Sequence, residues 1–339
     1  MRGVKSSLRI SLGLTTGMRI KDGLEYAQIA EDSGYYRIFV GEDVLSREVF
    51  TYLSLISLRT QRVLIASGIA ALFARNVALI ASGAAGMQEL SGGRFTLGIG
   101  IGGAPEIEKL TGKRPKKVGK VLREATTVIK KLFNKEKVTY NGFYVDLDSY
   151  ELEIPFKTPP EIYFGVRGPK LLSIAGELAD GVIFSGPKKY LFQAVKILDE
   201  AAEKAGKNPK EITKVLWNPL MIAEKAEELE QAKKIVATII STLPSFILKY
   251  LEDQKEQIEA IKSVYEAGEY GGMAETITEA SKKVTPELLD QFCVTGSKEE
   301  IIEAFKEYQK EGFQEFIIGP PYGSEPKKAI AAFKPFTEA

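Results

Sequence analysis

The hydrophobic positions of this chain form short apolar runs that alternate with segments of helical periodicity. The run Leu8–Leu14 is followed by Lys21–Asp32, in which apolar residues recur every three or four positions. The same order returns at Tyr36–Val40 and again at Val63–Ala71, whose sequence VLIASGIAA has no polar alternation. Strands without alternation are typical of parallel sheets that helices cover on both faces. The pattern therefore predicts an α/β fold.

Eight of these runs are predicted as strands, and each precedes a predicted helix. They are Leu8–Leu14, Tyr36–Val40, Val63–Ala71, Phe95–Ile101, Ile162–Val166, Val182–Phe184, Val215–Ile222 and Phe313–Ile318. Eight βα units in one chain indicate a closed (β/α)8 barrel of the TIM type. An open doubly wound sheet is the alternative, because strand order cannot be read from the pattern. We treat residues 1–339 as one barrel domain.

Two segments depart from the alternation and are predicted as insertions. Apolar and polar residues alternate over Val138–Glu153 around Asn141-Gly142, a strong hairpin signal, so we expect a β-hairpin at about 137–154. Residues 224–291 are almost wholly helical in pattern and longer than one crossover needs. We expect an α-helical insertion there.

Composition excludes several classes of function. The chain has 46 basic and 45 acidic residues, a balance that favours neither nucleic acid nor a membrane surface as partner. No apolar run approaches the ~18 residues that a bilayer span needs. Met1–Arg9 lacks the apolar region of a signal peptide, so we expect a cytoplasmic protein.

The usual acid–base and metal-binding side chains are scarce. There is no histidine, and Cys293 is the only cysteine, which excludes an internal disulfide and a cysteine zinc cluster. Its neighbours Phe292 and Val294 favour a buried, inert thiol. We expect no metal site, and proton transfer must fall to Asp, Glu, Lys, Tyr, water or a cofactor.

In a barrel of this type the active site lies just past the carboxyl ends of the strands. The segments at these positions are Gly13–Thr16, Gly41–Asp43, Ser67–Ala70, Gly100–Ala104, Gly165–Gly168, Ser185–Gly186 and Gly319–Pro320. They are rich in glycine and poor in nucleophiles, which favours a large, flat or phosphorylated ligand bound against the backbone. The glycines of Ile99–Gly103 do not have the spacing of a dinucleotide fingerprint.

Two of these segments carry candidate chemistry. After the fifth strand, Arg167 and Gly168 precede Pro169, which suits the first turn of a helix whose free N–H groups could hold an anion. The alternative is an ordinary tight connection. After the second strand, Glu42 or Asp43 could donate a proton or contact a cofactor ring. The alternative there is that Asp43 caps the next segment while Glu42 is solvated.

The basic segment Lys109–Arg123 holds seven basic residues and no acid. Such a segment is usually a solvated face, but beside an active-site mouth it would also attract an anionic coenzyme tail.

Three segments of this chain resemble the luciferase-like superfamily, and most closely its archaeal methylenetetrahydromethanopterin reductases. They are Ser67–Ser82 (SGIAALFARNVALIAS), Glu89–Gly102 (ELSGGRFTLGIGIG) and Gly165–Ile183 (GVRGPKLLSIAGELADGVI). The resemblance covers nearly the whole chain. It implies a barrel that uses coenzyme F420, an 8-hydroxy-5-deazaflavin, and assembles as a homodimer or higher homo-oligomer.

The resemblance also implies roles for individual residues. It places a bulge with a non-prolyl cis peptide at Gly68-Ile69, against the back of the coenzyme ring, and the turn at Gly168-Pro169 near the phosphate-bearing tail. The coenzyme-binding residues it implies are Gly68, Ile69, Arg75, Asn76, Gly100, Gly102, Gly165, Arg167, Gly168, Pro169 and Ser185.

This chain departs from those reductases at several site positions. Gly13 and Gly103 stand where the reductases have carboxylates, and Arg167 stands where they have glutamine. Their Asp-His pair after the second strand is Glu42-Asp43 here.

These departures leave three hypotheses open. The first is a coenzyme F420-dependent oxidoreductase that moves a hydride between the deazaflavin and an electrophilic carbon, a pterin iminium or a carbonyl, with Glu42, Asp43 and Arg167 as catalytic candidates. The second is an FMN-dependent monooxygenase of the same superfamily. The third is a non-catalytic deazaflavin-binding protein.

Overall fold

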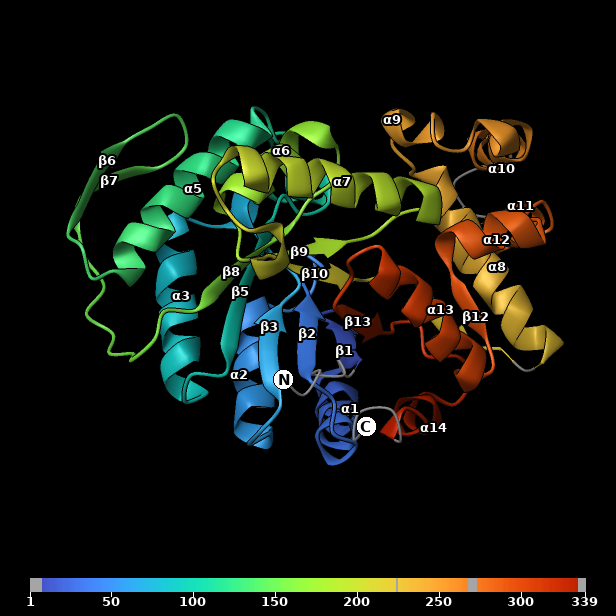
Figure 1. The fold of residues 1–339 in the computed structure, drawn as a ribbon, viewed down its shortest axis with the longest axis horizontal. Helices are drawn as coiled ribbons and strands as arrows, with labels where there is room; N and C mark the ends of the chain where they lie inside the picture. Colours follow the sequence, from blue (N-terminus) through green and yellow to red (C-terminus); the bar gives the residue numbers. More distant parts are fainter. Residues whose placement is uncertain (1–7, 224, 268–272, 335–339) are drawn as a thin grey trace, which may run out of the picture.

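The computed structural model describes residues 8–223, 225–267 and 273–334 and shows a closed parallel barrel (Figure 1). Its strands are β1 (Arg9–Thr15), β2 (Arg37–Gly41), β3 (Leu64–Ser67) continued by β4 (Ala70–Ala71), β5 (Phe95–Gly100), β8 (Glu161–Gly165), β9 (Gly181–Phe184), β10 (Thr213–Leu216) and β13 (Glu315–Ile318). Their order is β3-β2-β1-β13-β10-β9-β8-β5-β4, and a further pairing of β3 with β5 closes the ring. The predicted TIM barrel is confirmed, and the open doubly wound sheet is excluded.

Helices follow the strands and cover the outside of the barrel (Figure 1). They are α1 (Ile20–Asp32), α2 (Val49–Arg59), α3 (Val77–Leu90), α4 (Ala104–Thr111), α5 (Val118–Phe133), α6 (Pro169–Leu178), α7 (Lys188–Lys204), α13 (Lys298–Lys310) and α14 (Pro326–Ala331), with short 3₁₀ turns at Leu72–Ala74, Pro209–Glu211 and Glu252–Gln254. Local capping fixes where several begin. Ser297 and Glu300 form a capping box at the start of α13, and the Asn76 side chain accepts from the Ala78 N–H at the start of α3.

A hairpin and a group of helices lie on opposite sides of the barrel (Figure 1). The hairpin strands β6 (Val138–Asn141) and β7 (Asp146–Tyr150) pair antiparallel around Asn141-Gly142. The Glu124 carboxylate of α5 holds the turn by accepting the N–H groups of Phe143 and Tyr144 at 2.9 and 2.8 Å. Burial opposes ionisation of Glu124, but these backbone hydrogen bonds outweigh it and lower its pKa.

The group of helices opposite the hairpin lies in the sequence between two strands that pair in a short parallel ladder. It comprises α8 (Ala226–Ser241), α9 (Ser245–Leu248), α10 (Lys255–Ala267), α11 (Met273–Ser281) and α12 (Pro286–Phe292). The ladder pairs β11 (Leu220–Ile222) with β12 (Val294–Gly296). The prediction of one strand over Val215–Ile222 is therefore wrong, because the chain leaves the barrel after Leu216 and Pro219 has no N–H for a continuous ladder.

The interior of the barrel is filled by side chains. A layer of buried residues occupies its middle: Phe39, Ala66, Tyr163, Ile183, Val215 and Ile317. Towards the amino-terminal end, buried Arg37 lies 3.6 Å from the Glu315 carboxylate, which also accepts from the Ser11 hydroxyl at 2.6 Å. No channel therefore runs through the barrel, and a ligand can bind only at one of its two ends.

The third predicted strand is interrupted in the middle. The cis peptide expected between Gly68 and Ile69 is present and separates β3 from β4.

In the described ranges, no helix is long and apolar enough to cross a membrane.

Candidate active site at the carboxyl mouth

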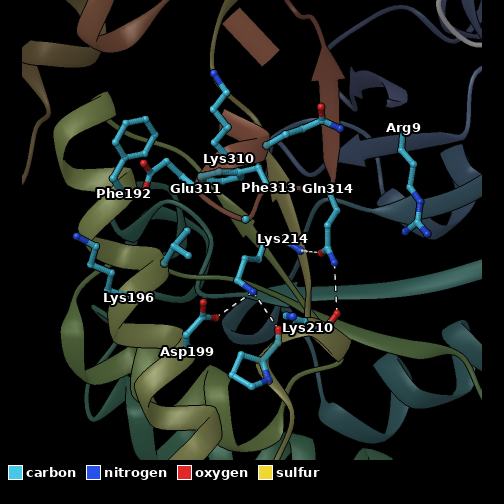
Figure 2. Close-up of a pocket in the computed structure, with 14 residues that line it drawn as sticks. Arg9, Phe192, Lys196, Asp199, Lys210, Lys214, Lys310, Glu311, Phe313 and Gln314 are labelled. Carbon is cyan, nitrogen blue, oxygen red and sulfur yellow. Dashed lines mark hydrogen bonds and ion pairs between the residues drawn. The ribbon is translucent and has the colours of Figure 1, made fainter. Parts of the chain in front are cut away.

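A cavity of about 670 Å³ lies among the loops that precede β10 and β13, at the amino-terminal face. Barrel enzymes place their chemistry at the other face. The deepest charge of this cavity, Lys214, is already paired with Asp199 at 2.9 Å. The charged ends of Arg9, Lys196 and Lys310 point away from one another (Figure 2). Side chains that do not converge make a poor binding site, so we take the opposite face, at the carboxyl ends of the strands, as the candidate.

Trp217 and Ile69 form the floor of the carboxyl mouth. Trp217 follows β10 and donates its indole N–H to the Gly319 carbonyl at 2.9 Å, which fixes the ring across the top of the barrel. Its ring centroid lies 6.1 Å from that of Phe39, in the buried layer beneath. Trp217 and Ile69 are both only partly buried and pack on that layer. The mouth therefore has an apolar floor that solvent, or a ligand, can reach.

The glycines of the rim make room for these two side chains. A Cβ on Gly68 would lie 2.5 Å from the Trp217 ring, and a Cβ on Gly13 would lie 2.8 Å from it. A Cβ on Gly165 would lie 2.6 Å from Ile69, and one on Gly100 would lie 2.9 Å from it. Separations this short do not occur between real carbon atoms, so glycine is required at these positions. The glycines at the carboxyl ends of the strands predict a ligand bound against the backbone. In the structure they make space for the side chains of Trp217 and Ile69.

Glu42 is held by protein donors on one side of the mouth. Its Oε2 accepts from the Ala71 N–H at 2.7 Å and from Arg75 Nη1 at 2.9 Å, and its Oε1 contacts Arg75 Nη2. The Glu42 side chain is 3% exposed. Burial would lower the pKa of Arg75, but the hydrogen bonds and charge of Glu42 outweigh it and raise that pKa.

Asp43 joins the loops that follow β1 and β2. Its carboxylate accepts from the Gly17 N–H at 2.8 Å, and its own N–H donates to the Thr16 hydroxyl at 2.9 Å. Arg47 donates to the carbonyls of the same β1 loop. Asp43 thus connects the two loops through Oδ2, and its side chain is exposed at the rim.

Arg167 and Ser185 come together on the other side of the mouth. Arg167 Nη2 donates to Ser185 Oγ at 2.8 Å, and the next N–H, that of Gly168, donates to the Tyr190 hydroxyl at 2.9 Å. The Arg167 side chain is solvent-accessible, yet the protein around its guanidinium desolvates the charge and lowers its pKa. The pKa of an arginine in water is so high that Arg167 remains cationic despite this shift. Phe246 of α9 borders Gly168, 3.5 Å from where a Cβ would lie.

Two further candidates, Asn76 and Gly102, have structural roles. Asn76 caps α3, and Gly102 has φ +80°, the left-handed region that favours glycine. Gly103, where the resemblance implies a carboxylate, immediately precedes α4, and the Glu106 side chain fills the space a Cβ there would need. Within the described ranges, no group of three or more His, Cys, Asp or Glu residues is arranged to hold a metal ion. Burial raises the pKa of Cys293 to about 12, so its thiol is inert at neutral pH.

The sequence analysis missed Trp217 and Tyr322. Tyr322 is buried and donates its hydroxyl to the Gly13 carbonyl, so it supports the rim from below. Trp217 was hidden inside the wrongly predicted strand Val215–Ile222. Pro219 could have indicated the strand end, because a proline has no N–H to donate to the ladder of a central strand. Trp217, two positions before it, would then be placed at the carboxyl end of the strand.

Comparison with known proteins agrees with this geometry. A family model described as "Luciferase-like monooxygenase" matches residues 1–315. The 5,10-methylenetetrahydromethanopterin reductase of Archaeoglobus fulgidus is 30% identical over 311 residues, which cover 90% of this chain and 91% of that protein. The F420-dependent glucose-6-phosphate dehydrogenase of Kribbella flavida is 26% identical, with 90% of each chain covered.

The fold has a counterpart among solved structures. The coenzyme F420-dependent tetrahydromethanopterin reductase from Methanopyrus kandleri superimposes with a TM-score of 0.85 at 21% identity, covering 97% of each chain. At this identity the likeness concerns the fold. Together with the match of the family model to most of the sequence, these findings identify the chain as a member of the luciferase-like monooxygenase family.

Proposed function

We propose that this protein is a coenzyme F420-dependent oxidoreductase whose hydride acceptor is a cationic iminium carbon, as in a methylenetetrahydromethanopterin. The relatives described above that are named for reactions of this coenzyme support the cofactor class. The chain has no histidine, and its single cysteine is buried, so the redox chemistry has to come from a bound organic carrier.

The residues at the mouth fit such a carrier. The floor of Ile69 and Trp217 offers an apolar surface to a flat ring, and Arg167 with Ser185 offers donors to an anionic tail. The bound deazaflavin would supply or accept a hydride at C5. The protein itself orients the two reactants over the floor and excludes water between them.

The observation that favours an iminium over a carbonyl is the state of the two carboxylates after β2. Hydride addition to a carbonyl leaves an alkoxide, which needs a proton donor, whereas hydride addition to an iminium carbon leaves a neutral amine that needs none. Glu42 accepts from Arg75 and Ala71, and Asp43 Oδ2 accepts from Gly17, so each carboxylate already serves as an acceptor for protein donors. An acceptor that is already cationic matches this arrangement.

Trp217 provides the test, because it is the only tryptophan of the chain and lies in the floor. We expect coenzyme F420 to quench its fluorescence saturably, FMN to do so more weakly, and the Trp217→Phe variant to lose the signal. We then expect oxidation of reduced F420 by methylenetetrahydromethanopterin but not by a simple ketone.

Each other outcome has a defined meaning. Quenching by FMN alone would overturn the cofactor assignment in favour of a monooxygenase. Tight F420 binding without turnover of any acceptor would identify a non-catalytic binding protein. Faster turnover of a ketone than of the pterin would refute the iminium argument alone.

A further inference from the structure

The Glu42 carboxylate is the centre of a connection between a strand and a helix. Three protein donors occupy its two oxygens: the Ala71 N–H and both terminal nitrogens of Arg75. A guanidinium carries donors and no acceptor, so the carboxylate that it grips acts as an acceptor and has no proton to give in this arrangement.

Arg75 extends the connection to α2. Its Nη2 lies 3.4 Å from Glu48, and the Glu48 carboxylate caps α2 by accepting from the Thr51 N–H at 2.7 Å. The Arg75 side chain is 16% exposed, and Glu48 is 45% exposed, so the connection runs from a buried end to a solvated one. The β4 backbone is thereby fastened to the start of a helix on the barrel wall.

The fastened backbone carries the floor. Ala71 pairs with Gly100 of β5, and Ile69, two residues before Ala71, contacts the positions of Gly100 and Gly165. A shift of β4 therefore moves Ile69 across the mouth. The pairing of β4 with β5 and the contacts of Glu42 together set the position of Ile69.

We propose that Glu42 is a positioning residue: through Ala71 and Arg75 it sets where Ile69 lies in the floor, and it donates no proton in the reaction. This inference rests on the proposed function, since it concerns the surface on which the coenzyme ring would lie. It replaces the interpretation of Glu42 as a catalytic acid.

The test compares Glu42→Gln with Glu42→Ala. The amide of Gln keeps an oxygen for the Ala71 N–H and cannot be a proton donor of the carboxylic type, whereas Ala removes both functions. We expect Glu42→Gln to keep the pH profile of hydride transfer. We expect it to weaken coenzyme binding, measured by Trp217 quenching, less than Glu42→Ala does, because its NH₂ group cannot accept from Arg75 Nη2 but its oxygen still accepts from the Ala71 N–H. We expect Glu42→Ala to weaken binding and to slow transfer by about 100-fold, as a displacement of ~1 Å at a reacting centre can do.

Two further variants keep the test decisive if Glu42→Ala fails to fold. Arg75→Lys replaces the two-pronged guanidinium with a single ammonium, and we expect it to weaken coenzyme binding while leaving the pH profile unchanged. Glu177→Gln is the matched control, because it breaks another two-pronged pair, with Arg123, on the exposed face of α5 and α6. We expect it to change neither affinity nor rate.

The failures are distinguishable. If Glu42→Gln abolishes transfer and removes one limb of the pH profile while coenzyme affinity stays at the wild-type value, Glu42 is the acid and the inference is wrong, although the proposed function stands. If the wild-type protein binds no F420, the proposed function fails first. The inference then fails with it.

Discussion

Replacing Gly13 with alanine tests whether the rim glycines exist to admit Trp217. The added Cβ would lie 2.2 Å from the Gly319 carbonyl oxygen, 2.7 Å from Ile317 Cγ2 and 2.8 Å from the Trp217 ring. Ile317 lies in β13 and Gly319 directly follows it, and β13 pairs with β1 through the register of Leu12 with Ile318. The methyl group can therefore fit only if β1 and β13 separate or the indole moves.

The cost follows from overpacking. Inserting a methyl group into a packed site usually costs 1–3 kcal/mol, and two of the obstructing groups here are backbone or a hydrogen-bonded ring, so we expect about 3 kcal/mol. The entropy of unfolding for 339 residues is about 0.7 kcal/mol per kelvin. The melting temperature should therefore fall by about 4 °C.

Gly86→Ala is the matched control. A Cβ on Gly86 meets nothing within 4 Å, and the residue lies inside α3. The same chemical change should stabilise this helix by about 0.5–1 kcal/mol and raise the melting temperature by about 1 °C. Differential scanning calorimetry measures both shifts, and Trp217 emission reports whether the indole has moved. An unchanged melting temperature with unchanged emission in Gly13→Ala would refute the packing argument.

Two further substitutions test how loops are attached to the barrel. Glu31 accepts the N–H groups of Gln61, Arg62 and Val63; burial would raise its pKa, but these hydrogen bonds outweigh burial and lower it. The lowered pKa stabilises the fold at pH values above the pKa of the unfolded chain, about 4.3. This stabilisation is lost as the pH falls through the lower pKa of the folded protein. Glu31→Gln should thus lower the free energy of unfolding by about 1–2 kcal/mol at pH 7, and the difference from the wild-type protein should shrink below about pH 4. Urea unfolding at both pH values measures this difference, and a difference that does not change with pH would contradict the prediction. Arg94 donates to the carbonyls of Val63, Thr60 and Ser57. Arg94→Lys, with one nitrogen for three acceptors, should lower the melting temperature by about 2–3 °C, and an unchanged value would contradict that role.

The sequence was sufficient for the barrel because each strand is buried on both faces. Such strands appear as continuous apolar runs, and all eight barrel strands lie within or next to the runs from which they were predicted. The wrong boundary at Val215–Ile222 arose because an apolar run continued past Pro219 into β11. Hydrophobicity alone cannot distinguish one buried strand from two that belong to different sheets.

The site was less accessible to sequence reasoning, because its contacts join residues far apart in the chain. Glu42 and Arg75 are 33 positions apart, and Trp217 and Gly319 are 102 positions apart. A pattern can show that a carboxylate follows a strand, but not that an arginine 33 positions later will pair with it. The resemblance to the luciferase-like family supplied the position of the cis peptide at Gly68-Ile69, which local sequence could not.

The glycine at position 13 and the presence of Trp217 are two aspects of one arrangement. The closest approach of a Cβ at Gly13 is to the same carbonyl, Gly319, that accepts the indole N–H. A larger acidic side chain at position 13 would have to displace either that hydrogen bond or the ring. Introducing a carboxylate at position 13 would therefore damage the floor. A reaction in this mouth has to proceed over an apolar surface beside carboxylates that already accept hydrogen bonds from protein groups, and an acceptor that brings its own positive charge meets that condition.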